Sequence, residues 1–141
     1  VSKVVTTLTD PVNGATDPYD IPGAEVAYTI TVANEGAGIV DAGSLIITDV
    51  VPDDVALRIT PAPTVVFADG AVASGVSLNP ANARFSNQPG GGAPFDYTPT
   101  PDGTGVDASV TGVRIELTGA MNANGGSGSP SFTLTFNAVV R

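Results

Sequence analysis

The chain lacks three side chains on which much protein chemistry depends: its 141 residues include no cysteine, no histidine and no tryptophan. It can therefore form no disulfide and no Ser-His-Asp or Cys-His nucleophile, and it has none of the His or Cys ligands that zinc, copper and haem prefer. Carboxylates are the remaining candidates for catalysis. Asp53 and Asp54 adjoin, but successive side chains of a strand face opposite ways, so they form no natural acid–base pair. We predict that the protein is not an enzyme.

Positive charge is also scarce, since five Lys and Arg residues face 14 Asp and Glu residues and the net charge is −9. Nucleic acids and anionic membrane surfaces are recognised by basic patches, so we predict neither as a partner. No apolar run approaches the roughly 18 residues of a membrane span, and we predict no membrane insertion. The chain starts at Val1 without a basic-then-apolar leader, which fits a mature product after signal-peptide removal or an excised fragment. With its Thr/Gly/Pro-rich loops, the chain is expected to be secreted or on the extracellular surface.

The chain is rich in β-branched residues that alternate with a period of two, the pattern of half-buried strands. Gly, Pro, Asn and Asp clusters separate these segments, and no helix of ten or more residues has a convincing 3.6-residue period. We predict one all-β domain over residues 1–141, an antiparallel two-sheet immunoglobulin-like sandwich of about seven to nine strands. The expected strands cover residues 1–9, 25–33, 44–51, 55–59, 64–68, 76–78, 111–118 and 132–140.

Two segments depart from simple alternation. Residues 44–51 are apolar on both faces, which predicts a central strand covered on each side. Residues 79–107 contain the Gly90-Gly91-Gly92 run and several prolines, and they are expected to be the least regular part of the domain because Gly and Pro interrupt strand ladders.

A pattern of turns and strands runs from Ile21 to Pro52. It comprises Pro22-Gly23, then Val26-Ala27-Tyr28-Thr29-Ile30-Thr31-Val32, then Asn34-Glu35-Gly36, and finally Thr48-Asp49-Val50-Val51-Pro52. It resembles the bacterial and archaeal surface-protein repeat known as domain of unknown function number eleven. The resemblance implies an immunoglobulin-like sandwich in a secreted or cell-surface protein, and it implies no catalytic residues. The pattern covers about a quarter of the chain, whose second half is longer than the usual repeat.

The N-terminal strand is the main functional candidate. Residues 1–9 are apolar on both faces and precede a hinge of Pro, Gly and Asp over residues 10–23. Such a strand can pair within its own domain or with a neighbour's open sheet edge. We predict a structural protein that self-assembles by donor-strand exchange into a homopolymer, an extracellular filament or pilus-like fibre, with Val4, Val5 and Leu8 setting the register by burial. The predicted assembly strand contains Val1, Lys3, Val4, Val5, Thr6, Thr7 and Leu8.

The alternative is a monomeric surface module that binds a glycan or a protein. Tyr19, Phe95 and Tyr97 lie in expected loops and could stack on sugars. No cofactor is predicted, although oxygen ligands from loops could hold calcium. The candidate acids are Asp17 with Asp20, and Asp96 with Asp102 and Asp107.

Lys3 raises one further possibility, an isopeptide bond to Asn137 on the last strand, as found in pilin-like sandwiches. The alternation argues against it, since Asn137 points away from the apolar face of its strand. An intact mass equal to the sequence mass would rule it out.

Overall fold

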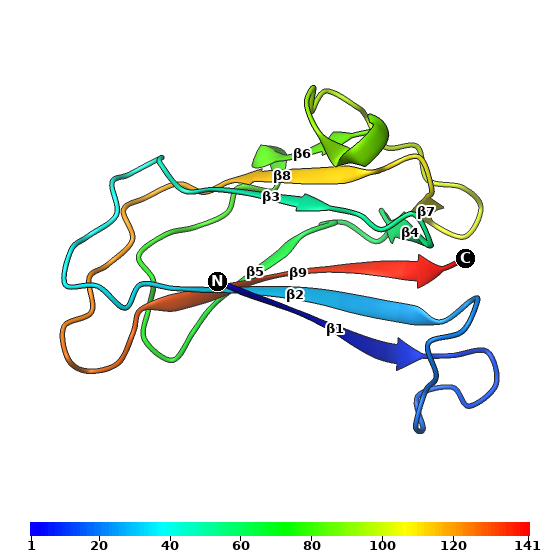
Figure 1. Cartoon of the computed structure of the whole chain (residues 1–141), viewed down its shortest axis with the longest axis horizontal. Coiled ribbons are helices and arrows are strands. Elements are labelled where there is room, and N and C mark those ends of the chain that lie inside the picture. Colours follow the sequence, from blue (N-terminus) through cyan, green and yellow to red (C-terminus); the bar gives the residue numbers. More distant parts are fainter.

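The computed structural model describes residues 1–141 and contains nine strands in two facing antiparallel sheets (Figure 1). The strands are β1 (Ser2–Thr9), β2 (Glu25–Ala33), β3 (Ile46–Val50), β4 (Val55–Arg58), β5 (Val66–Asp69), β6 (Ala83–Ser86), β7 (Val106–Asp107), β8 (Gly112–Glu116) and β9 (Ser131–Val140). The larger sheet has the order β1-β2-β9-β4-β7, with β5 also paired to β9, and the smaller sheet has the order β3-β8-β6. The predicted all-β sandwich is confirmed.

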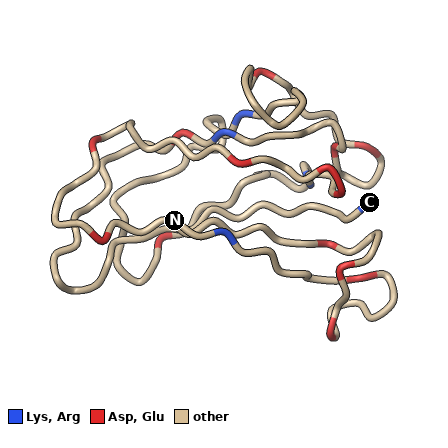
Figure 2. The backbone as a smooth tube through the Cα atoms, viewed as in Figure 1, with Lys and Arg blue, Asp and Glu red and all other residues tan.

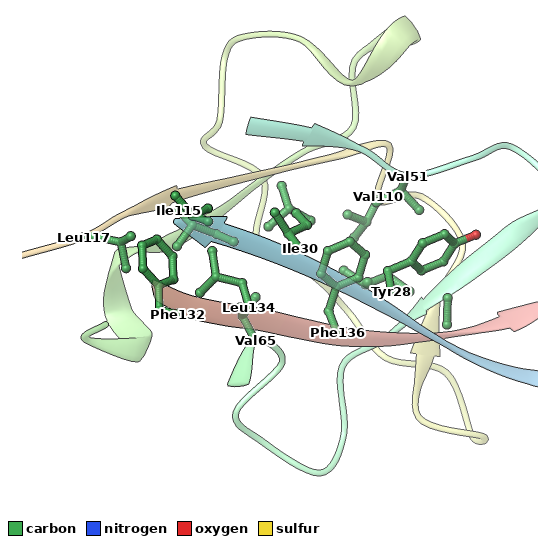
Figure 3. Close-up of a cluster of buried hydrophobic side chains, with 14 of the residues drawn as sticks. Tyr28, Ile30, Val51, Val65, Val110, Ile115, Leu117, Phe132, Leu134 and Phe136 are labelled. Atoms are coloured by element: carbon green, nitrogen blue, oxygen red, sulfur yellow. The ribbon is translucent and has the colours of Figure 1, made fainter. Parts of the chain in front are cut away.

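The core lies between the two sheets and follows from the alternation of the strands. Successive side chains of a strand point to opposite faces, so every second residue of β2, β8 and β9 is buried. Figure 3 shows side chains from both layers meeting in this core. The rings of Tyr28 and Phe136 stack with centroids 5.4 Å apart, and those of Phe67 and Phe132 do the same. This aromatic and aliphatic layer holds the sheets together without disulfides.

Two predictions about the strands are wrong. The segment expected to be a central strand forms β3, which lies at the edge of the smaller sheet, and its Ile46 and Val50 side chains are exposed. Apolar residues on both faces indicate burial only where both faces are covered, and the outer face of β3 is not. Residues 76–78 form no strand, only an isolated bridge between Ser77 and Thr118.

The Gly- and Pro-rich region is more ordered than its composition indicates. It contains β6, β7 and two single-turn 3-10 helices, Pro80–Asn82 and Pro89–Gly91. The side chain of Asn79 caps the first of these helices by accepting from the backbone N–H of Ala81. None of the helices is long and apolar enough to cross a membrane.

Candidate functional site

The N-terminal strand β1 occupies one edge of the larger sheet (Figure 1). It pairs with β2 alone, in a register that runs from Ser2 opposite Thr31 to Thr7 opposite Val26 and becomes irregular before Thr9. The other edge of β1 carries backbone N–H and C=O groups with no strand beside them. Such an edge is a template for pairing with a further strand. The predicted assembly strand is therefore an edge strand whose outer edge is open to a further strand.

The apolar side chains of β1 are exposed, with 58% of Val4, 52% of Val5 and 39% of Leu8 accessible to solvent. The prediction that these three residues set the register by burial concerns the assembled fibre and stays a prediction. The smaller sheet has three strands against six in the larger one, and β1 is the edge strand of the larger sheet. Exposed apolar residues on an edge strand are typical of surfaces that pair with another chain.

Lys3 makes the contact that joins β1 to the opposite sheet. It lies opposite Ile30 on the inner face of β1, and its Nζ is 2.6 Å from Oδ2 of Asp49 on β3. The same ammonium lies over the Tyr28 ring, 4.7 Å from its centroid, and 5.9 Å from that of Phe136. A cation over aromatic faces is attracted by the ring quadrupoles. Lys3 is thus held by one carboxylate and two rings.

The structure does not bring Lys3 and Asn137 together. The side-chain amide of Asn137 donates to Oε1 of Glu25, which also accepts from Arg58 Nε. Lys3 instead meets Asp49, a residue that sequence reasoning did not select. The sequence does carry a signal for Asp49. This residue alternates with Ile47 and Val51, so it lies on the inner face of its strand, where the other positions are apolar.

The predicted hinge, residues 10–23, is a folded loop organised by Asp10. The buried Asp10 carboxylate accepts hydrogen bonds of 2.6 Å from each of the backbone N–H groups of Val12, Asn13 and Tyr19. At the far end of the loop, the N–H of Gly23 donates to the C=O of Val140 in β9. The hinge is therefore closed by one side chain, and opening it requires these bonds to break.

The same contacts predict how the hinge responds to pH. Backbone hydrogen bonds from Asn13 and Tyr19 lower the pKa of Asp10 below its usual 3.8. A carboxyl group with a lowered folded-state pKa stabilises the fold above pH 3.8, and this stabilisation is lost as the pH falls through the lowered value. We expect Asp10→Asn to speed amide exchange at Val12, Asn13 and Tyr19 at neutral pH, measured by hydrogen exchange. Acidification through the lowered pKa should reduce the protection of the same amides in the unaltered chain, once the observed rates are corrected for the slower intrinsic exchange at acid pH.

Asp17→Asn is the matched control, because it removes the same charge from the same loop and its carboxylate makes no hydrogen bond in the structure. Equal exchange rates in the two variants would show that net charge, rather than the Asp10 hydrogen bonds, governs the loop.

The larger set of acids proposed for calcium does not gather into a metal site, and the pair Asp17 and Asp20 stays a prediction. No three Asp or Glu residues form a group that could hold a metal ion, so the predicted set of Asp96, Asp102 and Asp107 does not form. Asp102 Oδ1 accepts from the N–H and hydroxyl of Thr104, and Asp107 accepts from the backbone N–H of Thr100 and Ser109. These carboxylates shape their own loops. Figure 2 shows acidic residues spread over both layers and the loops.

The candidate aromatic residues divide between two places. Phe95 and Tyr97 are half-buried and line a shallow pocket with Phe85 of β6, whereas Tyr19 is exposed in the hinge and is not part of this pocket. The Tyr97 hydroxyl donates to Asp107 Oδ2 over 2.8 Å, which raises the pKa of Tyr97 and fixes its ring. Phe85, which sequence reasoning missed, is a strand residue whose side chain is left half-covered at the sheet edge.

Fold and geometry define an all-β sandwich whose N-terminal edge strand is held by one ladder and one ion pair across the sheets. No family model matches the chain, and neither a curated protein nor a solved structure matches it.

Proposed function

We propose that the protein is a secreted or cell-surface structural subunit that assembles into an extracellular filament or pilus-like fibre. In the fibre, β1 leaves its own sheet edge and pairs with β2 of the next copy. The observation that carries the proposal is the state of β1, which pairs with a single strand while exposing Val4, Val5 and Leu8. A strand with this little burial is replaced by an identical strand from another copy at low cost, as in domain swapping.

The length of the hinge supports the proposal. Residues 10–23 can span roughly 48 Å when extended, at about 3.4 Å per residue. A strand of ten residues, the length of β9, is only about 33 Å long. An opened hinge therefore lets β1 reach the sheet edge of an adjacent domain. Because donor and acceptor surfaces differ, each copy that donates a strand still offers its own β2 edge, and the contact propagates head to tail.

The first test is the removal of residues 1–9. We expect the full chain to form fibres under negative-stain electron microscopy and to sediment at high speed, and the truncated chain to do neither. A chain of equal length with residues 1–9 scrambled is the control for non-specific effects of an unpaired terminus. Circular dichroism of both variants should show that the remaining sandwich is folded. Monodisperse monomers from the full chain at high concentration would contradict the proposal.

A second candidate function is supported by the pocket that Phe85, Phe95 and Tyr97 line beside Arg84 and Asp96. Aromatic rings next to charged hydrogen-bonding groups are suited to sugars, so a monomeric glycan-binding module is the alternative. Isothermal titration against cell-wall polysaccharides tests it. Heat release that is lost in Phe95→Ala, together with an absence of fibres, would favour this function over assembly.

A further inference from the structure

Lys3 is an unusual residue for the inner face of a strand. It is the only lysine of the chain, and it occupies the same face as Val5 and Thr7, opposite the core residues of β2. Only 34% of its side chain is exposed. Removing an ammonium from water is unfavourable unless an anion compensates for it. Lys3 therefore restricts where β1 can bind, because the surface that receives β1 must supply a carboxylate beside the Lys3 ammonium.

Asp49 supplies that carboxylate. Its side chain is 16% exposed, and its Oδ2 atom is buried, with no partner other than the Lys3 ammonium. The Lys3 ammonium 2.6 Å away is thus the single group that compensates its charge. The two other ion pairs of the domain join Arg58 to Glu25 and Arg114 to Glu116, so neither arginine serves Asp49. Without β1 in place, this carboxylate has no cation.

The pair discriminates between registers of β1 on the β2 edge. A slip of one residue would turn Lys3 to the outer face of the sheet, because side chains alternate. A slip of two residues would move its Cα by about 7 Å, which takes the ammonium out of contact with Asp49. Val4, Val5 and Leu8 contribute less to this distinction, since all three are largely exposed in the domain's own sheet. The ion pair is the feature of β1 that favours a single register.

We propose that Lys3 and Asp49 form a charge clasp between copies, in which Lys3 of a donated β1 pairs with Asp49 of the accepting copy and so selects both the partner strand and its register. This inference rests on the proposed function, because the accepting copy is the next subunit of the fibre. The partner that fits the site is a second copy of this chain whose strand carries a cation at position 3. Strands with a neutral or acidic residue there are rejected, since they leave a carboxylate uncompensated or place two anions together.

Charge reversal tests the clasp with full-length chains. Lys3→Glu alone places two acids together, and Asp49→Lys alone places two lysines together. We expect each variant to raise the concentration needed for fibres by at least roughly tenfold, as like charges do at a partly buried contact. An equimolar mixture should assemble again, because each variant then accepts the other's strand. The double variant Lys3→Glu/Asp49→Lys should assemble alone.

The Arg58–Glu25 pair provides the matched control, because both residues belong to the body of one domain. Mixing Arg58→Glu with Glu25→Arg cannot restore that pair, whichever copy β1 enters. Circular dichroism and thermal melting verify that each variant is folded.

The outcomes separate the clasp from the proposed function. Single variants that assemble like the unaltered chain would overturn the clasp and leave strand donation intact. A double variant that assembles while the mixture does not would show that the pair closes within one chain, which also overturns it. An unaltered chain that forms no fibres would overturn both.

Discussion

Mild oxidation of a chain that carries both Thr7→Cys and Val26→Cys is expected to link its fibres covalently, giving a ladder of multimers on a non-reducing gel. Thr7 lies directly opposite Val26 in the β1–β2 ladder. Just beyond the end of β2, the backbone N–H of Asn34 donates to the C=O of Pro130, which precedes β9. Backbone groups of a strand point alternately to its two neighbours, so the even-numbered residues of β2 hydrogen-bond to β9 and the odd-numbered ones to β1. Thr7 and Val26 therefore form a non-hydrogen-bonded pair of the β1–β2 ladder. Side chains are closer in such pairs, as a disulfide requires. The chain has no other cysteine, so every disulfide reports this one contact.

The two single variants supply the control. A mixture of Thr7→Cys and Val26→Cys chains should give a linked dimer that joins one chain of each kind, and neither variant alone should give a β1–β2 link. A strand that stays in its own domain would instead give an intrachain disulfide in the double variant and no linked dimer in the mixture. That result would exclude strand donation, whatever the fibres look like by microscopy.

Phe132→Ala is expected to destabilise the domain by about 3–5 kcal/mol, the usual effect of emptying a fully buried aromatic position. Phe132 has no exposed surface, and its ring stacks on Phe67 with centroids 5.4 Å apart. It stands near the start of β9, which pairs with β2, β4 and β5 and therefore connects most of the larger sheet. Urea unfolding measures the loss, and a thermal melt should show the midpoint lowered by roughly 10 °C or more.

Ile46→Ala is the comparison for this variant, since Ile46 is also a large apolar strand residue but is exposed at the edge of the smaller sheet. We expect a change within about 0.5 kcal/mol, as for other surface substitutions. Similar losses in both variants would mean that β3 is covered in solution, and assembly through that edge would then need to be considered.

The strands with strict alternation could be predicted from the sequence, and those that depend on their neighbours could not. β2 matches its predicted bounds, Glu25–Ala33, because polar and apolar residues alternate along it and turn residues close both ends. The apolar side chains of Ile46 and Val50 favour a central position for β3, yet edge or centre is decided by which strands pair beside it. β6 and β7 were missed because each is short and lies among Gly and Pro residues.

The location of the candidate site was predictable, but its chemistry was not. A strand at residues 1–9 followed from local pattern, and the structure has it as β1. The contact between Lys3 and Asp49 depends on the register of β1 on β2 and on which strand of the other sheet lies across from it. Neither the register nor the facing strand can be predicted from a short stretch of sequence. The same holds for Phe85, whose neighbours Phe95 and Tyr97 reach it through a Gly- and Pro-rich loop.

The antiparallel ladder between β1 and β2 has a mechanical consequence. In a fibre joined by this strand, tension enters the donated β1 at Thr9 and leaves the accepting copy through its own hinge, which meets β2 at Glu25, the residue opposite Thr9. Both points of load lie at the same end of the ladder, so the pull opens the pairs one after another, from the Thr7–Val26 end towards Ser2–Thr31. The contact between Lys3 and Asp49 lies near the far end of β1 and is reached late in this opening, so it contributes to the rate of rupture, which governs resistance to force.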